Sequence, residues 1–134
     1  MKALACFIAI IAAGLAGCVT PFGVPPDVAH VKLEMGDSPV VRVTRIWLER
    51  RSGPLAVNGY VLRRPNATDT TQTHLDVTLY DETGQVLRST VEHFAPRQIP
   101  RRYRRPDAAF YRVVLDPLPA GTTRILVQAH EGNH

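Results

Sequence analysis

The chain has 134 residues, which is one domain's worth of sequence and excludes two ordinary hydrophobic cores. Its 16 Lys and Arg residues against 12 Asp and Glu give a formal net charge of +4. Both cysteines, Cys6 and Cys18, lie near the N-terminus, so no disulfide is expected to stabilise the folded domain.

The first 17 residues have the profile of a signal peptide. Lys2 supplies a positively charged N-terminal region, and every residue from Ala3 to Gly17 is apolar or small. A membrane-spanning helix needs about 20 such residues. We therefore expect residues 1–17 to be removed rather than to remain as an anchor.

The end of this segment resembles the bacterial lipobox, with a branched apolar residue, two small residues and a cysteine: Leu15, Ala16, Gly17 and Cys18. The resemblance implies cleavage before Cys18 and its lipidation. Two or three acyl chains hold a protein stably to a bilayer. Val19 stands where an aspartate would signal inner-membrane retention, so the resemblance implies the periplasmic face of the outer membrane. An ordinary secretory leader with an incidental cysteine is the alternative.

Residues 18–27 are expected to form a tether. Three prolines and one glycine fall between Val19 and Asp27, a composition typical of a stiff, extended spacer. At about 3.1 Å per residue, this spacer would hold the following domain up to roughly 28 Å from the bilayer.

Residues 28–134 favour a β-sandwich. No stretch sustains apolar residues at helical spacing over ten or more positions, whereas Val, Leu, Ile, Thr and Tyr gather in short segments between turn residues. Seven strands are predicted, near 28–34, 40–50, 55–64, 73–81, 85–94, 109–116 and 123–131. This layout indicates an all-β, seven-stranded immunoglobulin-like or transthyretin-like β-sandwich.

Two details of the layout depend on turn chemistry. Asn58-Gly59 would ordinarily indicate a hairpin turn, but its flanking arms are short and we expect a continuous strand across it. After Asp81, a three-residue loop ending at a left-handed Gly84 sets the register of the next hairpin. The predicted pairs are Leu79 with Leu87, Val77 with Ser89 and Leu75 with Val91.

Residues 75–87 resemble the central hairpin of FxLYD-type domains, small immunoglobulin-like modules of bacterial envelope lipoproteins. The run from Leu79 to Asp81 and Gly84 match that pattern, whereas Val77 replaces the name-giving Phe and Arg63 replaces the usual Asn. The resemblance implies the β-sandwich fold. Because the family shares no catalytic residues, it implies none here.

Five histidines raise the alternative of a periplasmic copper- or zinc-binding protein: His30, His74, His93, His130 and His134. The predicted register separates them, with His93 opposite Thr73 and His74 opposite Glu92. No His-x-His, His-Glu-x-x-His or Cys-x-x-Cys spacing is present, so we expect neither a metal site nor a cofactor. No serine lies in a Gly-x-Ser-x-Gly motif, and we expect no catalytic residue and no enzyme activity.

Residues 96–107 are the most distinctive segment of the mature chain. Five arginines lie among nine residues with prolines at both edges, which predicts a loop. The guanidinium groups of the arginines and the hydroxyl group of a tyrosine can form hydrogen bonds with carboxylates or phosphates of a partner. The candidate partner-binding residues are Arg97, Arg101, Arg102, Tyr103, Arg104 and Arg105. The alternative is a solvated connection whose charges oppose aggregation.

The sequence thus predicts a lipid-anchored periplasmic interaction or structural module of the cell envelope, an accessory subunit of a larger assembly. The membrane is reached through the lipid, and the expected partner is an envelope protein, peptidoglycan or lipopolysaccharide. Nucleic acid would fit the charge but not the compartment. A metal-binding lipoprotein and a surface adhesion factor are the alternatives.

Overall fold

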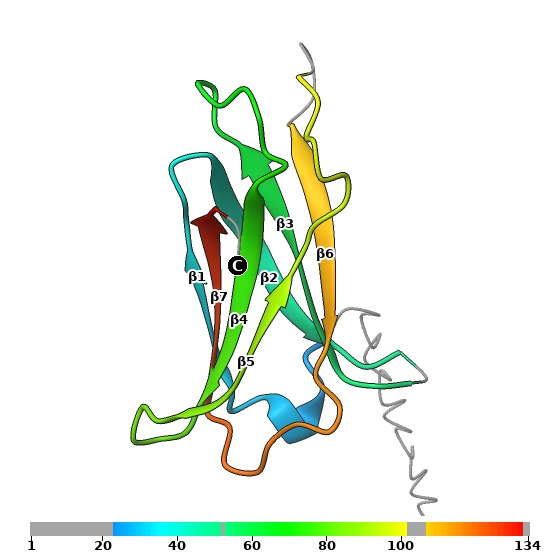
Figure 1. Ribbon diagram of the computed structural model, residues 1–134. Coiled ribbons are helices and arrows are strands. Elements are labelled where there is room, and N and C mark those ends of the chain that lie inside the picture. Colours follow the sequence, from blue (N-terminus) through cyan, green and yellow to red (C-terminus); the bar gives the residue numbers. More distant parts are fainter. Residues whose placement is uncertain (1–22, 52, 102–106, 133–134) are drawn as a thin grey trace, which may run out of the picture.

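The computed structural model describes residues 23–51, 53–101 and 107–132. Seven strands form two sheets that pack face to face (Figure 1). The prediction of an all-β, seven-stranded β-sandwich is confirmed, and the choice between an immunoglobulin-like and a transthyretin-like arrangement stays a prediction. In the described ranges no helix has the length and apolar character needed to cross a membrane.

One sheet has the strand order β1-β7-β4-β5 and the other the order β2-β3-β6. The strand bounds are β1 Lys32–Gly36, β2 Val41–Glu49, β3 Ala56–Arg63, β4 Thr73–Tyr80, β5 Val86–Glu92, β6 Ala108–Val114 and β7 Arg124–Glu131. Neighbouring strands are antiparallel except β1 and β7, which are parallel. Six of the predicted segments overlap these strands with small differences at their ends.

The first predicted strand begins too early. Pro26–Val28 instead form a single 3-10 turn, η1, and β1 begins at Lys32. Proline fits the start of such a turn because its missing N–H would have no partner there. Val28 and Val31 are buried in the core. The turn η1 therefore includes Pro26 and Asp27, the last two residues of the segment predicted to be a tether.

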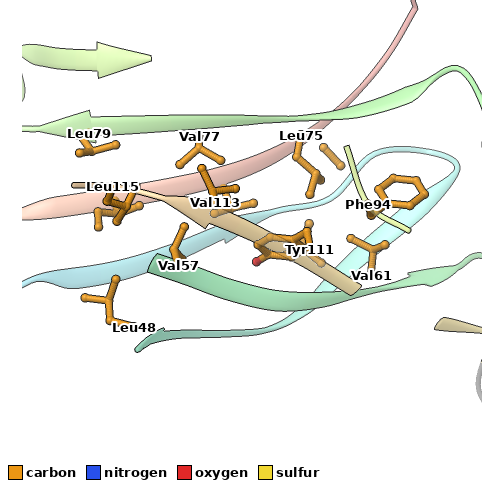
Figure 2. Packing of buried hydrophobic residues seen from close by; sticks show 14 of the residues in the cluster. Leu48, Val57, Val61, Leu75, Val77, Leu79, Phe94, Tyr111, Val113 and Leu115 are labelled. Atoms are coloured by element: carbon orange, nitrogen blue, oxygen red, sulfur yellow. The ribbon is translucent and has the colours of Figure 1, made fainter. Parts of the chain in front are cut away.

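The core lies between the sheets and takes alternate residues from each strand. Leu75, Val77 and Leu79 of β4 are fully buried, as their alternation with polar residues predicts. Figure 2 shows them directed towards the opposite sheet, where Val113 and Leu115 belong to the same cluster. Burying each such side chain contributes about 2 kcal/mol to stability. Further members are Val41, Val43, Leu48, Val57, Val61, Phe94, Ile99, Ile125 and Val127.

β3 runs without interruption through Asn58-Gly59, which confirms the expected continuous strand. Gly59 pairs with Tyr111 of β6. A Cβ atom on Gly59 would collide with the phenol of Tyr111 and with the carbonyl oxygen of Arg45. Glycine thus makes room for the Tyr111 ring, whose hydroxyl is buried without a hydrogen-bond partner among the described residues. Burial raises the pKa of Tyr111 above its ordinary value of 10.0.

The predicted register of the β4–β5 hairpin is correct at the turn and wrong beyond it. Gly84 has a φ of 84°, and the Asp81 N–H donates to the Gln85 carbonyl oxygen at 3.0 Å, as the turn chemistry predicts. The register then shifts by one residue, because Leu87 forms a β-bulge. The observed pairs are Leu79 with Arg88, Val77 with Thr90 and Leu75 with Glu92.

The bulge exchanges the faces of β5. Arg88 pairs with core-facing Leu79, and its guanidinium donates to the carbonyl oxygens of Leu115 at 2.7 Å and Pro117 at 3.1 Å. These hydrogen bonds join the edge of one sheet to the chain that leaves the other. Val91, predicted to face the core, pairs with Asp76 and is 43% exposed.

Candidate functional site

The arginine segment is only partly within the described residues. The Arg97 guanidinium donates to the Thr71 carbonyl oxygen, and Arg101 donates to the Pro65 carbonyl oxygen at 3.0 Å. Both arginines are therefore held by the connection between β3 and β4. Four predicted contact residues and the lipidation site lie outside the described residues: Arg102, Tyr103, Arg104, Arg105 and Cys18.

The chain between these two arginines is docked on the same connection. Ile99 is fully buried, and its N–H donates to the Thr70 hydroxyl oxygen at 2.9 Å. The Thr70 hydroxyl donates in turn to the Arg97 carbonyl oxygen at 2.6 Å, and the Gln98 amide donates to Thr68 at 3.0 Å. This part of the predicted loop is thus a fixed part of the domain.

Three aromatic residues form a cluster on the outer face of the β2-β3-β6 sheet. Trp47, Tyr60 and Phe110 come from the three different strands, and we call them the aromatic cluster. Ring centroids lie 5.7 Å apart for Trp47 and Tyr60, 5.6 Å for Tyr60 and Phe110, and 6.3 Å for Trp47 and Phe110. Tyr60 and Phe110 are each 39% exposed, and Val114, four residues beyond Phe110 on β6, is 53% exposed. Large apolar groups gathered on one surface mark interaction sites.

A β-bulge in β2 places Trp47 in this cluster. The pairing of β2 with β3 shifts by one residue between Val43 and Arg45, because Thr44 is the extra residue of the bulge. Odd-numbered residues face the core before the bulge, and even-numbered residues face it afterwards. Without the extra residue, Trp47 would share the inward face of Val43, since alternate residues of a strand point the same way.

Arginines surround the aromatic cluster. The Arg45 guanidinium carbon lies 5.3 Å from the centroid of the Trp47 ring, within the range of a cation–π contact. Arg42 and Arg45 are exposed, and within the described part of the chain they form no ion pair. Arg112, by contrast, pairs with Glu49 at 3.2 Å. This outer face therefore combines exposed rings with uncompensated positive charge.

The outer face of the other sheet carries two histidines and a carboxylate. His74 Nε2 lies 3.6 Å from Asp76 Oδ1, and His130 Nε2 lies 3.3 Å from Asp76 Oδ2. The two imidazole rings are stacked with centroids 5.9 Å apart. Across the described ranges, no group of three or more His, Cys, Asp or Glu side chains is arranged to hold a metal ion.

His93 lies nearer to this pair than the predicted register allowed. The register behind the prediction that His93 opposes Thr73 is wrong, because Glu92 pairs with Leu75 and not with His74, and this is the last pair of the two strands. The pKa of His93 is lowered from 6.5, first by desolvation and then by the positive charges of Arg97 and His74. The bulge therefore gathers histidines that the turn chemistry alone would separate.

The aromatic cluster was not among the sites predicted from the sequence, although the sequence contains a signal for it. In residues 41–49 the apolar alternation changes phase, from Val41 and Val43 to Ile46 and Leu48. Such a change indicates a bulge and assigns Trp47 to the outer face. Comparisons with protein-family models, curated proteins and solved structures find no match to this chain. The lipobox and FxLYD-type resemblances accordingly stay predictions.

Proposed function

We propose that this protein is a lipid-anchored interaction and structural module of the bacterial cell envelope. It is attached through Cys18 to the outer membrane, faces the periplasm and acts as an accessory subunit of an envelope assembly. The aromatic cluster is the observation that carries the interaction role. Trp, Tyr and Arg are the residue types that dominate binding energy in protein interfaces, and all three meet on this face.

The form of the surface also supports binding rather than catalysis. The rings are contributed by three hydrogen-bonded strands, so their relative positions are set by the sheet and not by a loop. A rigid surface loses little conformational entropy when it binds. The arginine segment, residues 96–107, remains a second proposed contact at one end of the sandwich.

Lipidation is tested by changing Cys18→Ser in the full-length chain, with Cys6→Ser as the matched control. Cells are labelled with an alkyne analogue of palmitate, and membranes are separated on a density gradient. We expect wild type and the control to carry label and to sediment with the outer membrane, and Cys18→Ser to lose both properties. Label that persists in Cys18→Ser contradicts the anchor, whereas inner-membrane sedimentation of labelled wild type contradicts only the location.

The interaction surface is tested by photo-crosslinking in cells. Two variants are made with the photoreactive residue p-benzoylphenylalanine. In one it replaces Tyr60, and in the other it replaces His130 on the opposite outer face. We expect a discrete protein adduct from position 60 and none from position 130, with the position 60 adduct lost in Trp47→Ser. Equal adduct yields from both positions would contradict this part of the proposal. The absence of an adduct from position 60 in a folded and anchored chain would contradict it as well.

A further inference from the structure

We propose that the partner of the aromatic cluster is a protein segment that carries carboxylates, which pair with Arg42 and Arg45 while its apolar side chains pack on the rings. This inference rests on the proposed function and adds the chemistry of the partner. It is drawn from the charges on the face, from the tilt of the rings and from the exposure of the rings.

The charges require an acidic partner. All 12 Asp and Glu residues of the chain lie within the described ranges, and none of them forms an ion pair with Arg42 or Arg45. Glu49 is the carboxylate of this face, and it already pairs with Arg51 and Arg112. Covering Arg42 and Arg45 with a neutral surface would remove two unpaired charges from water, which is costly. A partner that supplies carboxylates avoids that cost.

The same charges argue against a second copy of the chain. In a symmetric dimer a surface patch meets itself. Two copies joined through the aromatic cluster would bring Arg42 and Arg45 of one copy close to the positively charged face of the other copy. Like charges in close apposition cost several kcal/mol in an interface.

The tilt of the rings argues for protein side chains over flat ligands. The planes are inclined by 38° between Trp47 and Tyr60, 42° between Trp47 and Phe110, and 59° between Tyr60 and Phe110. A sugar ring or a nucleobase stacks face to face on one plane, so it would cover only one of these rings. Aliphatic and aromatic side chains pack readily against rings inclined to one another.

The exposure of the rings argues against insertion into a bilayer. Tyr60 and Phe110 are each 39% exposed, and each ring lies beside the other two rings of the cluster. Interfacial membrane binding buries an apolar face about 5–10 Å deep among headgroups and acyl chains. All three rings belong to strands of the sheet and not to a projecting loop or helix, so no segment carries them to that depth.

The test combines the crosslinker at position 60 with charge variants in the full-length, membrane-anchored chain. Arg42→Ser/Arg45→Ser removes the two arginines, Arg42→Lys/Arg45→Lys keeps their charge, and Lys32→Ser/Arg124→Ser removes two charges from the opposite outer face. We expect the adduct yield to fall about tenfold in the first variant and to stay near wild type in the other two. Mass spectrometry of the adduct should locate the crosslink beside Asp or Glu residues.

Three results overturn the inference while leaving the proposed function intact. The first is an adduct yield that does not change in Arg42→Ser/Arg45→Ser. The other two are a crosslink to a protein segment without carboxylates and a crosslink to a second copy of this chain. An adduct with lipid overturns it in favour of the membrane surface. The absence of any protein adduct in a folded, anchored chain overturns the proposed interaction role as well. Circular dichroism melts of each variant establish that it is folded.

Discussion

The two outer faces of the sandwich differ in how their charges are compensated. On the β1-β7-β4-β5 face, Glu34 pairs with Lys32 and Arg124, each at 2.9 Å. Hydrogen bonds from Arg124 and then Lys32 lower the pKa of Glu34, and Arg124 lies 3.9 Å from the centroid of the Tyr80 ring. On the β2-β3-β6 face, the exposed rings adjoin Arg42 and Arg45, which form no ion pair within the described part of the chain. The first face thus carries a compensated charge cluster, whereas on the second face the proposed partner would supply the compensating charge.

The largest loss of stability is expected when a buried arginine is replaced instead of one on an outer face. The Arg63 side chain is 4% exposed, and its guanidinium pairs with Asp107 at 2.7 Å and donates to the Ala67 carbonyl oxygen at 2.7 Å. Arg63→Ala should lower the free energy of unfolding by about 3 kcal/mol, because one partner of a buried pair is lost. Arg42→Ala should change it by less than about 0.5 kcal/mol. Urea denaturation checks both, and similar losses in the two variants contradict the comparison.

The next effect concerns the packing beneath the aromatic face. Gly59→Ala should destabilise the domain by about 2 kcal/mol, because the added methyl group meets the Tyr111 phenol. Adding Tyr111→Phe to this variant removes the hydroxyl and should recover part of the loss. Gly53→Ala, in the connection between β2 and β3, serves as the control and should melt near the wild-type temperature. Thermal unfolding followed by circular dichroism measures all three, and an unchanged melt for Gly59→Ala would show that the sheet adapts.

A smaller effect tests whether the first face is independent of the partner. Asp76→Asn weakens the contacts to His74 and His130 and should lower the free energy of unfolding by about 1 kcal/mol, since Asp76 and His130 are partly exposed although His74 is buried. The adduct formed from position 60 should be unchanged in this variant. Loss of the adduct in a folded Asp76→Asn chain would mean that both faces contribute to binding.

The smallest effect is a pH dependence of the first face. The unfolded chain has the ordinary His93 pKa of 6.5, whereas the folded-state pKa is lower. The unfolded chain therefore takes up a proton first, and stability falls as the pH drops through 6.5 towards the folded-state pKa. His93→Gln should lose less stability over this window. NMR titration of the His93 ring should give a pKa below 6.5, and a value above 6.5 reverses the sign.

The strand pattern was predictable because alternation in segments such as Leu75 to Leu79 follows directly from which residues the core can bury. The bulge in β5 escaped prediction because Leu87 fits the apolar pattern of its strand, whereas the bulge in β2 left a phase change that the prediction did not use. The sequence pattern assigns Leu87 to the core. In the structure Arg88 is the residue directed to that side, where it donates to the carbonyl oxygens of Leu115 and Pro117 after β6. The contacts of Arg97 and Arg101 with main-chain oxygens leave no trace in residue identity, because every residue carries that oxygen.

The parallel pairing of β1 with β7 has a mechanical consequence. Five residue pairs join the strands, from Lys32 with Arg124 to Gly36 with Gln128. The start of β1 and the end of β7 lie at opposite ends of the sandwich (Figure 1). A pull between the chain before Pro26 and the end of β7 therefore runs along both strands and shears their hydrogen bonds together instead of opening them one by one.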